Sequence, residues 1–156
     1  SKTFAMTGWR IGYLLSPDPD LMRELTKMQY YVTACSNDAM QHAVLEALER
    51  YPGYPEEMCA EFKERRDLIC ERLNAIPGVS CHVPTGAFYV FPKVEVPGMN
   101  SEEVALKLLE GGVLCSPGTA FGEAGEGHLR FAYTIGREDI SRGMDRVEAV
   151  LKDLMG

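Results

Sequence analysis

The sequence lacks several features that would mark a metalloprotein, a membrane protein or a secreted protein. It has one tryptophan and only three histidines, His42, His82 and His128, which show no metal-ligand spacing. No apolar run approaches the roughly 18 residues needed to span a bilayer, and no signal-peptide pattern is visible. We therefore expect no metal site and no membrane-spanning helix.

Positive charge is also scarce. The chain has 16 Lys and Arg against 23 Asp and Glu, a formal net charge of −7, and no basic run. This balance argues against a nucleic-acid or anionic-membrane surface as a partner. Any phosphate site must instead be local, made by one or two placed cations and by backbone N–H groups.

The five cysteines are odd in number and contain no Cys-x-x-Cys pair. This usage fits a reducing compartment, so we expect a cytoplasmic protein without a disulfide framework. We interpret all five cysteines as small apolar side chains of the interior.

Predicted strands and helices alternate along the 156 residues, which are enough to bury one core. This pattern predicts an α/β fold whose C-terminal domain is α+β. Prolines and glycine cluster at 51–55, which places a domain boundary between residues 1–50 and 51–156. Asn100 and Glu103 have the spacing of a capping box. We expect strands at 8–15, 79–83, 87–91, 113–115 and 128–133, and helices around 21–32, 40–48, 58–73, 104–109 and 140–154.

The first thirteen residues, Ser-Lys-Thr-Phe-Ala-Met-Thr-Gly-Trp-Arg-Ile-Gly-Tyr, are the most informative stretch. They describe a lysine-bearing loop that runs through a glycine into an apolar strand. Arg10 lies in that predicted strand, where burial of a guanidinium is costly without an anion. Either a phosphate or a protein carboxylate would supply that anion.

This string resembles the cofactor-lysine segment of the aspartate-aminotransferase-like (class I/II aminotransferase) family, which comprises pyridoxal 5'-phosphate (PLP) enzymes of fold type I. The resemblance implies that Lys2 is the catalytic Schiff-base lysine and that Arg10 grips the cofactor phosphate. Ser1 is a further candidate for a phosphate contact.

Two later segments extend the resemblance. Residues 127–133, Gly-His-Leu-Arg-Phe-Ala-Tyr, are similar to the family strand whose arginine pairs with the substrate α-carboxylate, which implies that role for Arg130. Residues 84–89, Pro-Thr-Gly-Ala-Phe-Tyr, are similar to a turn that brings an aromatic ring towards the substrate, and the matching residue is Phe88. A core aromatic is an equal alternative for Phe88.

The resemblance implies the end of the large PLP-binding domain, a connecting helix and the small C-terminal domain. It implies a parent homodimeric aminotransferase that moves an amino group between an L-amino acid and a 2-oxo acid. The family's other cofactor contacts precede the lysine, so we expect the chain alone to be an inactive fragment. Two alternatives stay open: another fold type I enzyme, such as a C–S lyase or synthase, and a non-catalytic binding module.

Overall fold

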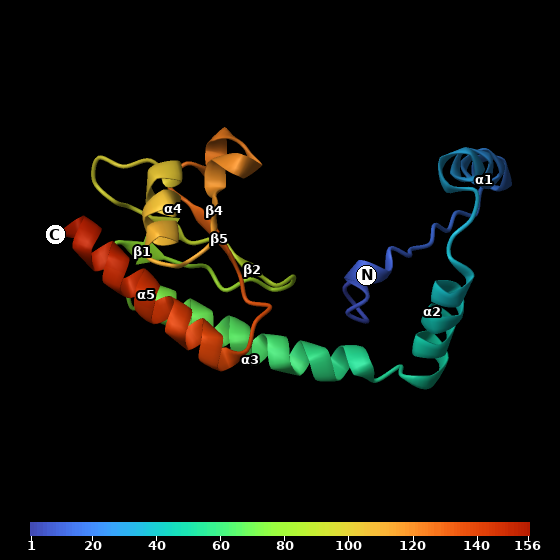
Figure 1. Ribbon diagram of the computed structural model, residues 1–156, viewed down its shortest axis with the longest axis horizontal. Helices are drawn as coiled ribbons and strands as arrows, with labels where there is room; N and C mark the ends of the chain where they lie inside the picture. The colour runs from blue at the N-terminus through green and yellow to red at the C-terminus, as the bar shows by residue number, and fades with distance from the viewer. The chain divides into compact units, whose positions relative to one another are not determined.

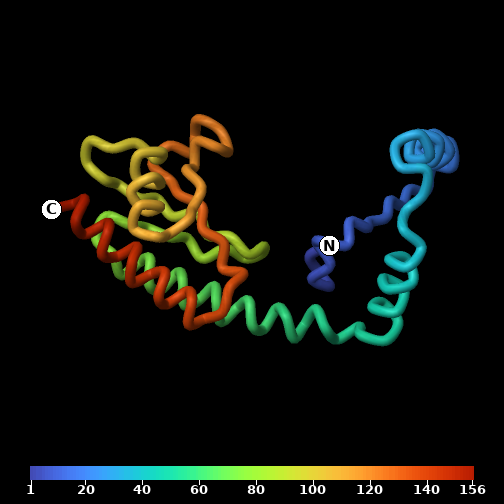
Figure 2. Tube along the Cα trace, in the orientation of Figure 1, coloured from blue at the N-terminus to red at the C-terminus, as the bar shows by residue number.

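The computed structural model describes all 156 residues and contains five α-helices, three 3₁₀-helices and five short strands (Figures 1 and 2). The chain divides into two units, an N-terminal unit of residues 1–58 and a C-terminal unit of residues 59–156. The predicted assignment of 1–50 to a large PLP-binding domain and of 51–156 to a small domain stays a prediction. No helix is both long enough and apolar enough to cross a membrane.

The N-terminal unit contains η1 (Thr7–Trp9), α1 (Pro19–Thr33) and α2 (Asp38–Arg50), which confirm the two helices expected there. Asp18 caps α1 by accepting hydrogen bonds from the first-turn amides, and Asn37 caps α2 in the same way. The strand predicted at 8–15 is wrong. This unit contains no strand, so an extended segment here has no partner for a ladder of hydrogen bonds. Arg10 adopts a left-handed conformation with φ 53°.

The remaining elements confirm the predicted α/β class, with helices joined to small antiparallel sheets. Strands β1 and β3 pair in one sheet, and a second sheet has the order β2-β5-β4. Helices α3 and α5 lie side by side, and the Arg72 guanidinium of α3 pairs with Asp145 and Glu148 of α5 (Figure 1). The elements are α3 (Tyr54–Asn74), β1 (Val79–Ser80), β2 (Tyr89–Val90), β3 (Lys93–Val94), α4 (Ser101–Glu110), β4 (Ser116–Pro117), η2 (Gly118–Phe121), η3 (Glu123–Gly125), β5 (Leu129–Ala132) and α5 (Arg137–Met155).

The capping box is confirmed: Asn100 accepts from the Glu102 and Glu103 amides, and the Glu103 carboxylate accepts from the Asn100 amide. The strand predicted at 113–115 is wrong, because β4 begins only at Ser116. The Val113 amide instead donates to Leu108 O at 2.8 Å and closes the end of α4.

The hydrophobic core lies in the C-terminal unit, between its helices and one face of the β2-β5-β4 sheet. Along β5 the buried Leu129 and Phe131 alternate with the more exposed Arg130 and Ala132, so the core-facing and outer faces of this sheet are clearly separated. The fully buried large side chains of this core are Leu73, Val90, Pro92, Leu108, Leu129, Tyr133, Val147 and Leu151.

Candidate functional site

The predicted cofactor segment forms a tight loop in the N-terminal unit. The Met6 amide donates to Ser1 O at 2.7 Å, and the Ala5 amide donates to Lys2 O at 3.1 Å. The side chains of Ser1, Lys2 and Arg10 are exposed. The Arg10 guanidinium donates to Thr7 O at 3.0 Å, and neither cation pairs with a carboxylate. Both cations are therefore free to meet an external group.

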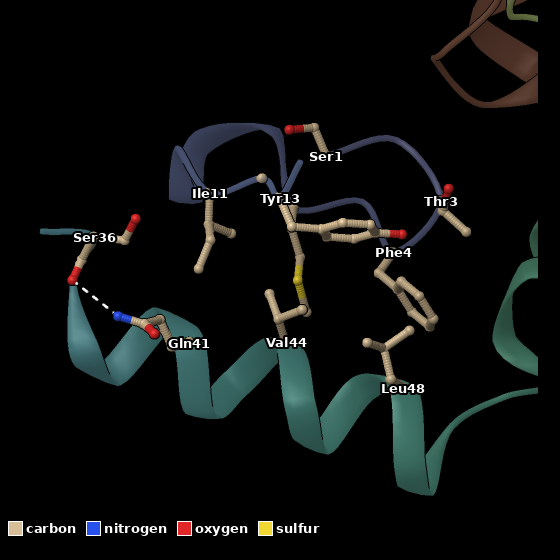
Figure 3. Close-up of a pocket in the computed structure, with 11 residues that line it drawn as sticks. Ser1, Thr3, Phe4, Ile11, Tyr13, Ser36, Gln41, Val44 and Leu48 are labelled. Carbon is tan, nitrogen blue, oxygen red and sulfur yellow. Dashed lines mark hydrogen bonds between the residues drawn. The ribbon is translucent and has the colours of Figure 1, made fainter. Parts of the chain in front are cut away.

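A cavity of about 440 Å³ lies between this loop and α2 (Figure 3). Phe4, Ile11 and Tyr13 of the loop line it opposite Val44 and Leu48 of α2. Most of its lining side chains are apolar, and Ser1 is at its edge. Lys2 and Arg10 do not line this cavity, and Arg10 instead borders a second hollow of about 760 Å³ with Tyr13 and residues of α1. The two predicted cofactor cations thus do not converge on one cavity in this chain.

Arg130 lies on the outer face of the β2-β5-β4 sheet, opposite the core. The strand register pairs Arg130 with Ser116 of β4, and its Nη2 donates to Ser116 Oγ at 3.3 Å. Its Cζ lies 4.5 Å from the Tyr89 ring centroid and 4.4 Å from the Phe121 ring centroid. No carboxylate pairs with this partly buried guanidinium. It is a cation held by aromatic rings without a counter-ion from the chain.

The carboxylate of Glu126 in the preceding loop is occupied elsewhere. Glu126 Oε1 accepts from the Ser101 amide at 2.8 Å, from Ser101 Oγ at 2.9 Å and from the Gly127 amide at 2.9 Å. These bonds, led by the Ser101 amide, lower the pKa of Glu126 because they favour its charged form. They tie loop 116–127 to the start of α4, and this carboxylate forms no ion pair with Arg130.

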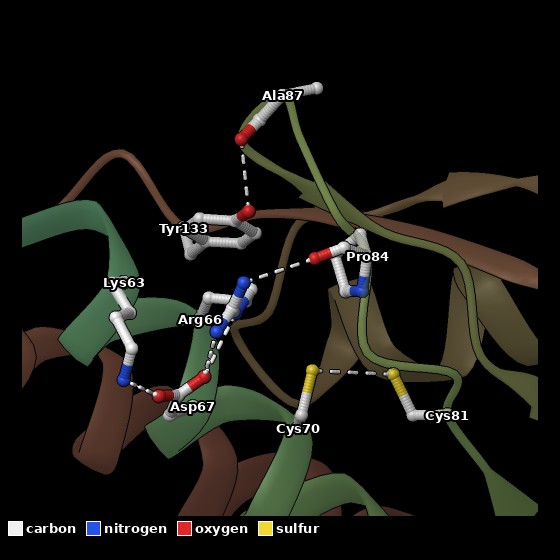
Figure 4. Close-up of polar contacts among 8 residues, drawn as sticks. All are labelled: Lys63, Arg66, Asp67, Cys70, Cys81, Pro84, Ala87 and Tyr133. Carbon is white, nitrogen blue, oxygen red and sulfur yellow. Dashed lines mark hydrogen bonds and ion pairs between the residues drawn. The ribbon is translucent and has the colours of Figure 1, made fainter. Parts of the chain in front are cut away.

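Phe88 is partly buried and packs against the core, with its ring centroid 6.2 Å from that of Phe62. Its predicted substrate role stays a prediction, while its packing is that of the core alternative. Two hydrogen bonds hold the turn at residues 84–87 (Figure 4). Tyr133 donates its hydroxyl hydrogen to Ala87 O at 3.0 Å, and Arg66 donates to Pro84 O at 3.3 Å. These bonds hold Ala87 at φ 61° and set where β2 begins.

Sequence reasoning missed Tyr89, Phe121 and Ser116, which are the side chains that contact Arg130. The period-2 pattern of a strand contained the signal for Tyr89, since the residue after a core-facing Phe88 points to the other face. Ser116 and Phe121 depend on strand register and on the path of loop 116–127, which no local pattern fixes.

The cysteines behave as small apolar groups, as predicted for those that are buried. Cys70 and Cys81 lie in the core with their Sγ atoms 3.9 Å apart (Figure 4), and all five cysteines are free thiols. Burial raises the pKa of Cys81 to about 12 and also raises the pKa of Cys70. Cys35 and Cys59 are exposed, which contradicts the expectation of burial for those two.

Comparison with known proteins gives a consistent result. Residues 1–147 match the family model described as Aminotransferase class I and II. The chain is 42% identical to an aspartate aminotransferase of Pyrococcus horikoshii over 155 residues, which are 97% of this chain and 39% of that protein. It is 42% identical to aromatic-amino-acid aminotransferase 2 of Thermococcus litoralis over 156 residues, covering 98% of this chain and 40% of that protein.

Solved structures agree with these sequence matches. The structure of an aromatic aminotransferase from Pyrococcus horikoshii superposes with a TM-score of 0.90 at 40% identity, and the match covers 98% of this chain and 41% of that one. An aspartate aminotransferase from Rhizobium meliloti superposes with a TM-score of 0.89 at 32% identity, over 98% of this chain and 40% of that one. The chain thus spans about two fifths of the length of the relatives it matches.

Proposed function

The chain belongs to the class I and II aminotransferase family, and from that premise we propose that the whole protein is a PLP-dependent aminotransferase. It would move an amino group between an L-amino acid and a 2-oxo acid. The observation that carries this proposal is Arg130, a partly buried guanidinium that has no carboxylate partner in a chain of net charge −7. Both substrates of a transamination carry a carboxylate beside the reacting carbon.

The chemistry of Arg130 suits that carboxylate. A guanidinium presents its N–H donors in one plane, so it can hold a carboxylate with two parallel hydrogen bonds. Nη2 donates one long bond of 3.3 Å to Ser116 Oγ, which leaves most of the donors free. Arg130 would therefore bind the α-carboxylate that all amino-acid substrates share. Selection among amino acids would depend on other residues, which contact the side chain of the substrate.

The first ten residues supply a donor set that fits PLP. Lys2 offers a primary amine for the cofactor aldehyde carbon, and Arg10 offers a guanidinium for the phosphate, with Ser1 as a further hydrogen-bond donor. Their exposed side chains carry no competing ion pair, which supports this assignment. When bound, PLP supplies an electron sink for negative charge at the substrate Cα. Lys2 Nζ would accept the proton from that carbon and donate it in the return step.

We also propose that the 156-residue chain alone does not turn over substrate. Lys2 and Arg10 are exposed and do not share a cavity in it, whereas transamination needs a positioned base and a site that excludes water. A homodimer and a cytoplasmic location complete the proposal. They are supported by the family resemblance and, for the cytoplasm, by five free thiols.

The lysine assignment is tested by reductive trapping. The chain is incubated with PLP, reduced with borohydride and mapped by peptide mass spectrometry. We expect the pyridoxyl label on Lys2, its loss in Lys2→Ala, and its retention in Lys27→Ala, a control that removes another exposed lysine of the same unit. Labelling concentrated at Lys27 or elsewhere would contradict the assignment.

The reaction is tested in a longer protein that contains this chain. A ¹⁵N-labelled amino acid is supplied with an unlabelled 2-oxo acid, using aspartate, aromatic and alanine donors. We expect ¹⁵N in the new amino acid and a large loss of kcat/KM in Arg130→Gln. Release of pyruvate and ammonia would favour a C–S lyase instead. Rapid turnover by the 156-residue chain would contradict its proposed inactivity.

A further inference from the structure

We propose that Tyr89 and Phe121 are positioning residues that hold the Arg130 guanidinium between their rings and leave its edge open to a carboxylate. The inference rests on the proposed function for the identity of the bound group. The ring contacts themselves do not depend on it.

The geometry places Arg130 Cζ within 4.5 Å of the Tyr89 ring centroid and within 4.4 Å of the Phe121 ring centroid. Both distances lie well inside the range of cation–π attraction. Each ring has another aromatic neighbour: the Tyr89 ring is tilted against the Phe88 ring at 47°, and the Phe121 ring meets the Phe91 ring edge-on. Two aromatic rings that come from different elements, β2 and η2, thus contact the guanidinium.

This arrangement decides which part of the guanidinium can bind. A ring that lies over the face of a planar guanidinium leaves uncovered the five N–H donors, which lie in the plane of the cation. Ser116 Oγ takes one of these donors at 3.3 Å, and no carboxylate of the chain takes any. In the proposed arrangement a carboxylate would approach edge-on, which is the approach that permits two parallel hydrogen bonds.

The rings also restrict the rotamers of the long, flexible Arg130 side chain. A free arginine loses much rotamer freedom when it is fixed on a ligand. If the rings already hold Arg130, that loss occurs on folding, and the carboxylate meets a preorganised donor. Removal of either ring should therefore weaken carboxylate binding even where the ring does not touch the ligand.

Both rings are placed by their surroundings. Tyr89 starts β2, directly after the turn held by Tyr133 and Arg66. Phe121 ends η2, in a loop closed by the Gly118 amide, which donates to His128 O at 2.8 Å. The loop requires glycine at its crossing, because a Cβ at Gly118 would lie 2.0 Å from Gly125 O. Phe121 is 54% exposed, and its place is set by the closed backbone of this loop.

The test uses NMR of the full 156-residue chain, with two readouts. The first is the Arg130 Hε resonance, which nearby rings shift upfield. We expect this shift in the unaltered chain and its partial loss in Phe121→Leu and in Tyr89→Leu. Phe91→Leu is the matched control, since Phe91 is on the same face and touches Phe121 without contacting the guanidinium. Phe121→Tyr should restore the shift.

The second readout is the dissociation constant of acetate, followed at Arg130 at constant ionic strength. We expect it to rise roughly 5-fold in Phe121→Leu and Tyr89→Leu, and to change little in Phe91→Leu. An unshifted Hε resonance, or an equal loss of affinity in Phe91→Leu with unchanged circular dichroism, would overturn the positioning role. A shifted resonance without acetate binding in the unaltered chain would instead contradict the carboxylate site of the proposed function.

Discussion

The two predicted anion-binding arginines, Arg10 and Arg130, lie in units of opposite character. Every buried hydrophobic residue of the chain except Ala47 belongs to the C-terminal unit. The N-terminal unit instead exposes many of its large apolar side chains, among them Trp9, Tyr13, Leu14, Leu15, Met28, Tyr30, Tyr31 and Val32.

The arginines show what this difference means for a functional site. The Arg10 guanidinium donates its hydrogen bond within its own loop, to Thr7 O three residues away. Arg130 contacts Tyr89 of β2, Ser116 of β4 and Phe121 of η2, which come from three different elements of the C-terminal unit. Local sequence is enough to form capped helices in both units. To position a functional side chain accurately enough for hydrogen bonding, a protein needs long-range packing, and only the C-terminal unit has it.

The largest expected effect that separates the two units is that of Leu→Ala substitution. Leu108 in α4 is fully buried, whereas Leu48 in α2 is 51% exposed. We expect Leu108→Ala to lower the free energy of unfolding of the C-terminal unit by about 2–5 kcal/mol, because it removes transfer free energy and leaves a cavity. Leu48→Ala should change the measured free energy of unfolding by less than about 0.5 kcal/mol. Urea denaturation followed by circular dichroism measures both.

A control within the same helix sharpens this result. Leu106 in α4 is 59% exposed, so Leu106→Ala should resemble Leu48→Ala although it lies two residues from Leu108. Equal losses for Leu48 and Leu108 would mean that the N-terminal unit has a core of its own in solution, and the contrast between the units would fail.

The sequence predicted the helices of both units and the capping box at Asn100, because those depend on neighbours within four residues. It failed for the strands predicted at 8–15 and 113–115. A strand exists only where a partner strand lies beside it, and the apolar pattern of 8–15 carries no information about a partner. The period of an apolar run is therefore weaker evidence for a strand than for a helix.

The candidate site shows the same limit. Arg130 was predicted as a carboxylate-binding residue from a short motif, and its place on the outer face follows from alternation with Leu129 and Phe131. The residues that hold it could not be predicted, since Phe121 reaches Arg130 only through the closed path of loop 116–127. The family motif thus identified Arg130, whereas the residues that contact Arg130 depend on the strand register and on the closure of loop 116–127.

An intermediate effect concerns alkaline stability. Burial raises the pKa of Cys81 to about 12, while an unfolded thiol ionises near 8.5. The unfolded chain therefore releases this proton first, so the contribution is complete below about pH 8.5 and is lost as the pH rises towards 12. We expect Cys81→Ala to remove about 1–2 kcal/mol of the stability loss between pH 8 and pH 10.

The remaining alkaline slope should come from Cys115, whose pKa burial raises to about 11, and from Cys70 and Tyr133, whose pKa values are also raised, chiefly by burial. Cys35→Ala is the control in the N-terminal unit, since that thiol is exposed. Urea midpoints at several pH values provide the measurement. An identical slope in Cys81→Ala and the unaltered chain would show that Cys81 ionises as readily in the folded state as in the unfolded state.

The smallest expected effect compares two helix caps of similar geometry. Asn100 caps α4 by accepting from the Glu102 and Glu103 amides, and Asp18 caps α1 by accepting from the Asp20 and Leu21 amides. Asn100→Ala should cost about 1 kcal/mol of C-terminal unit stability, because α4 is packed into the core.

Asp18→Ala removes the same kind of bond from a helix that has no buried residue. It should lower the helicity of α1, seen as a weaker circular dichroism signal at 222 nm, without moving the urea midpoint of the C-terminal unit. A shared midpoint shift would mean that α1 unfolds together with the core. The two units would then unfold in one cooperative transition. In that case the exposed apolar side chains of residues 1–58 would have packing partners in solution.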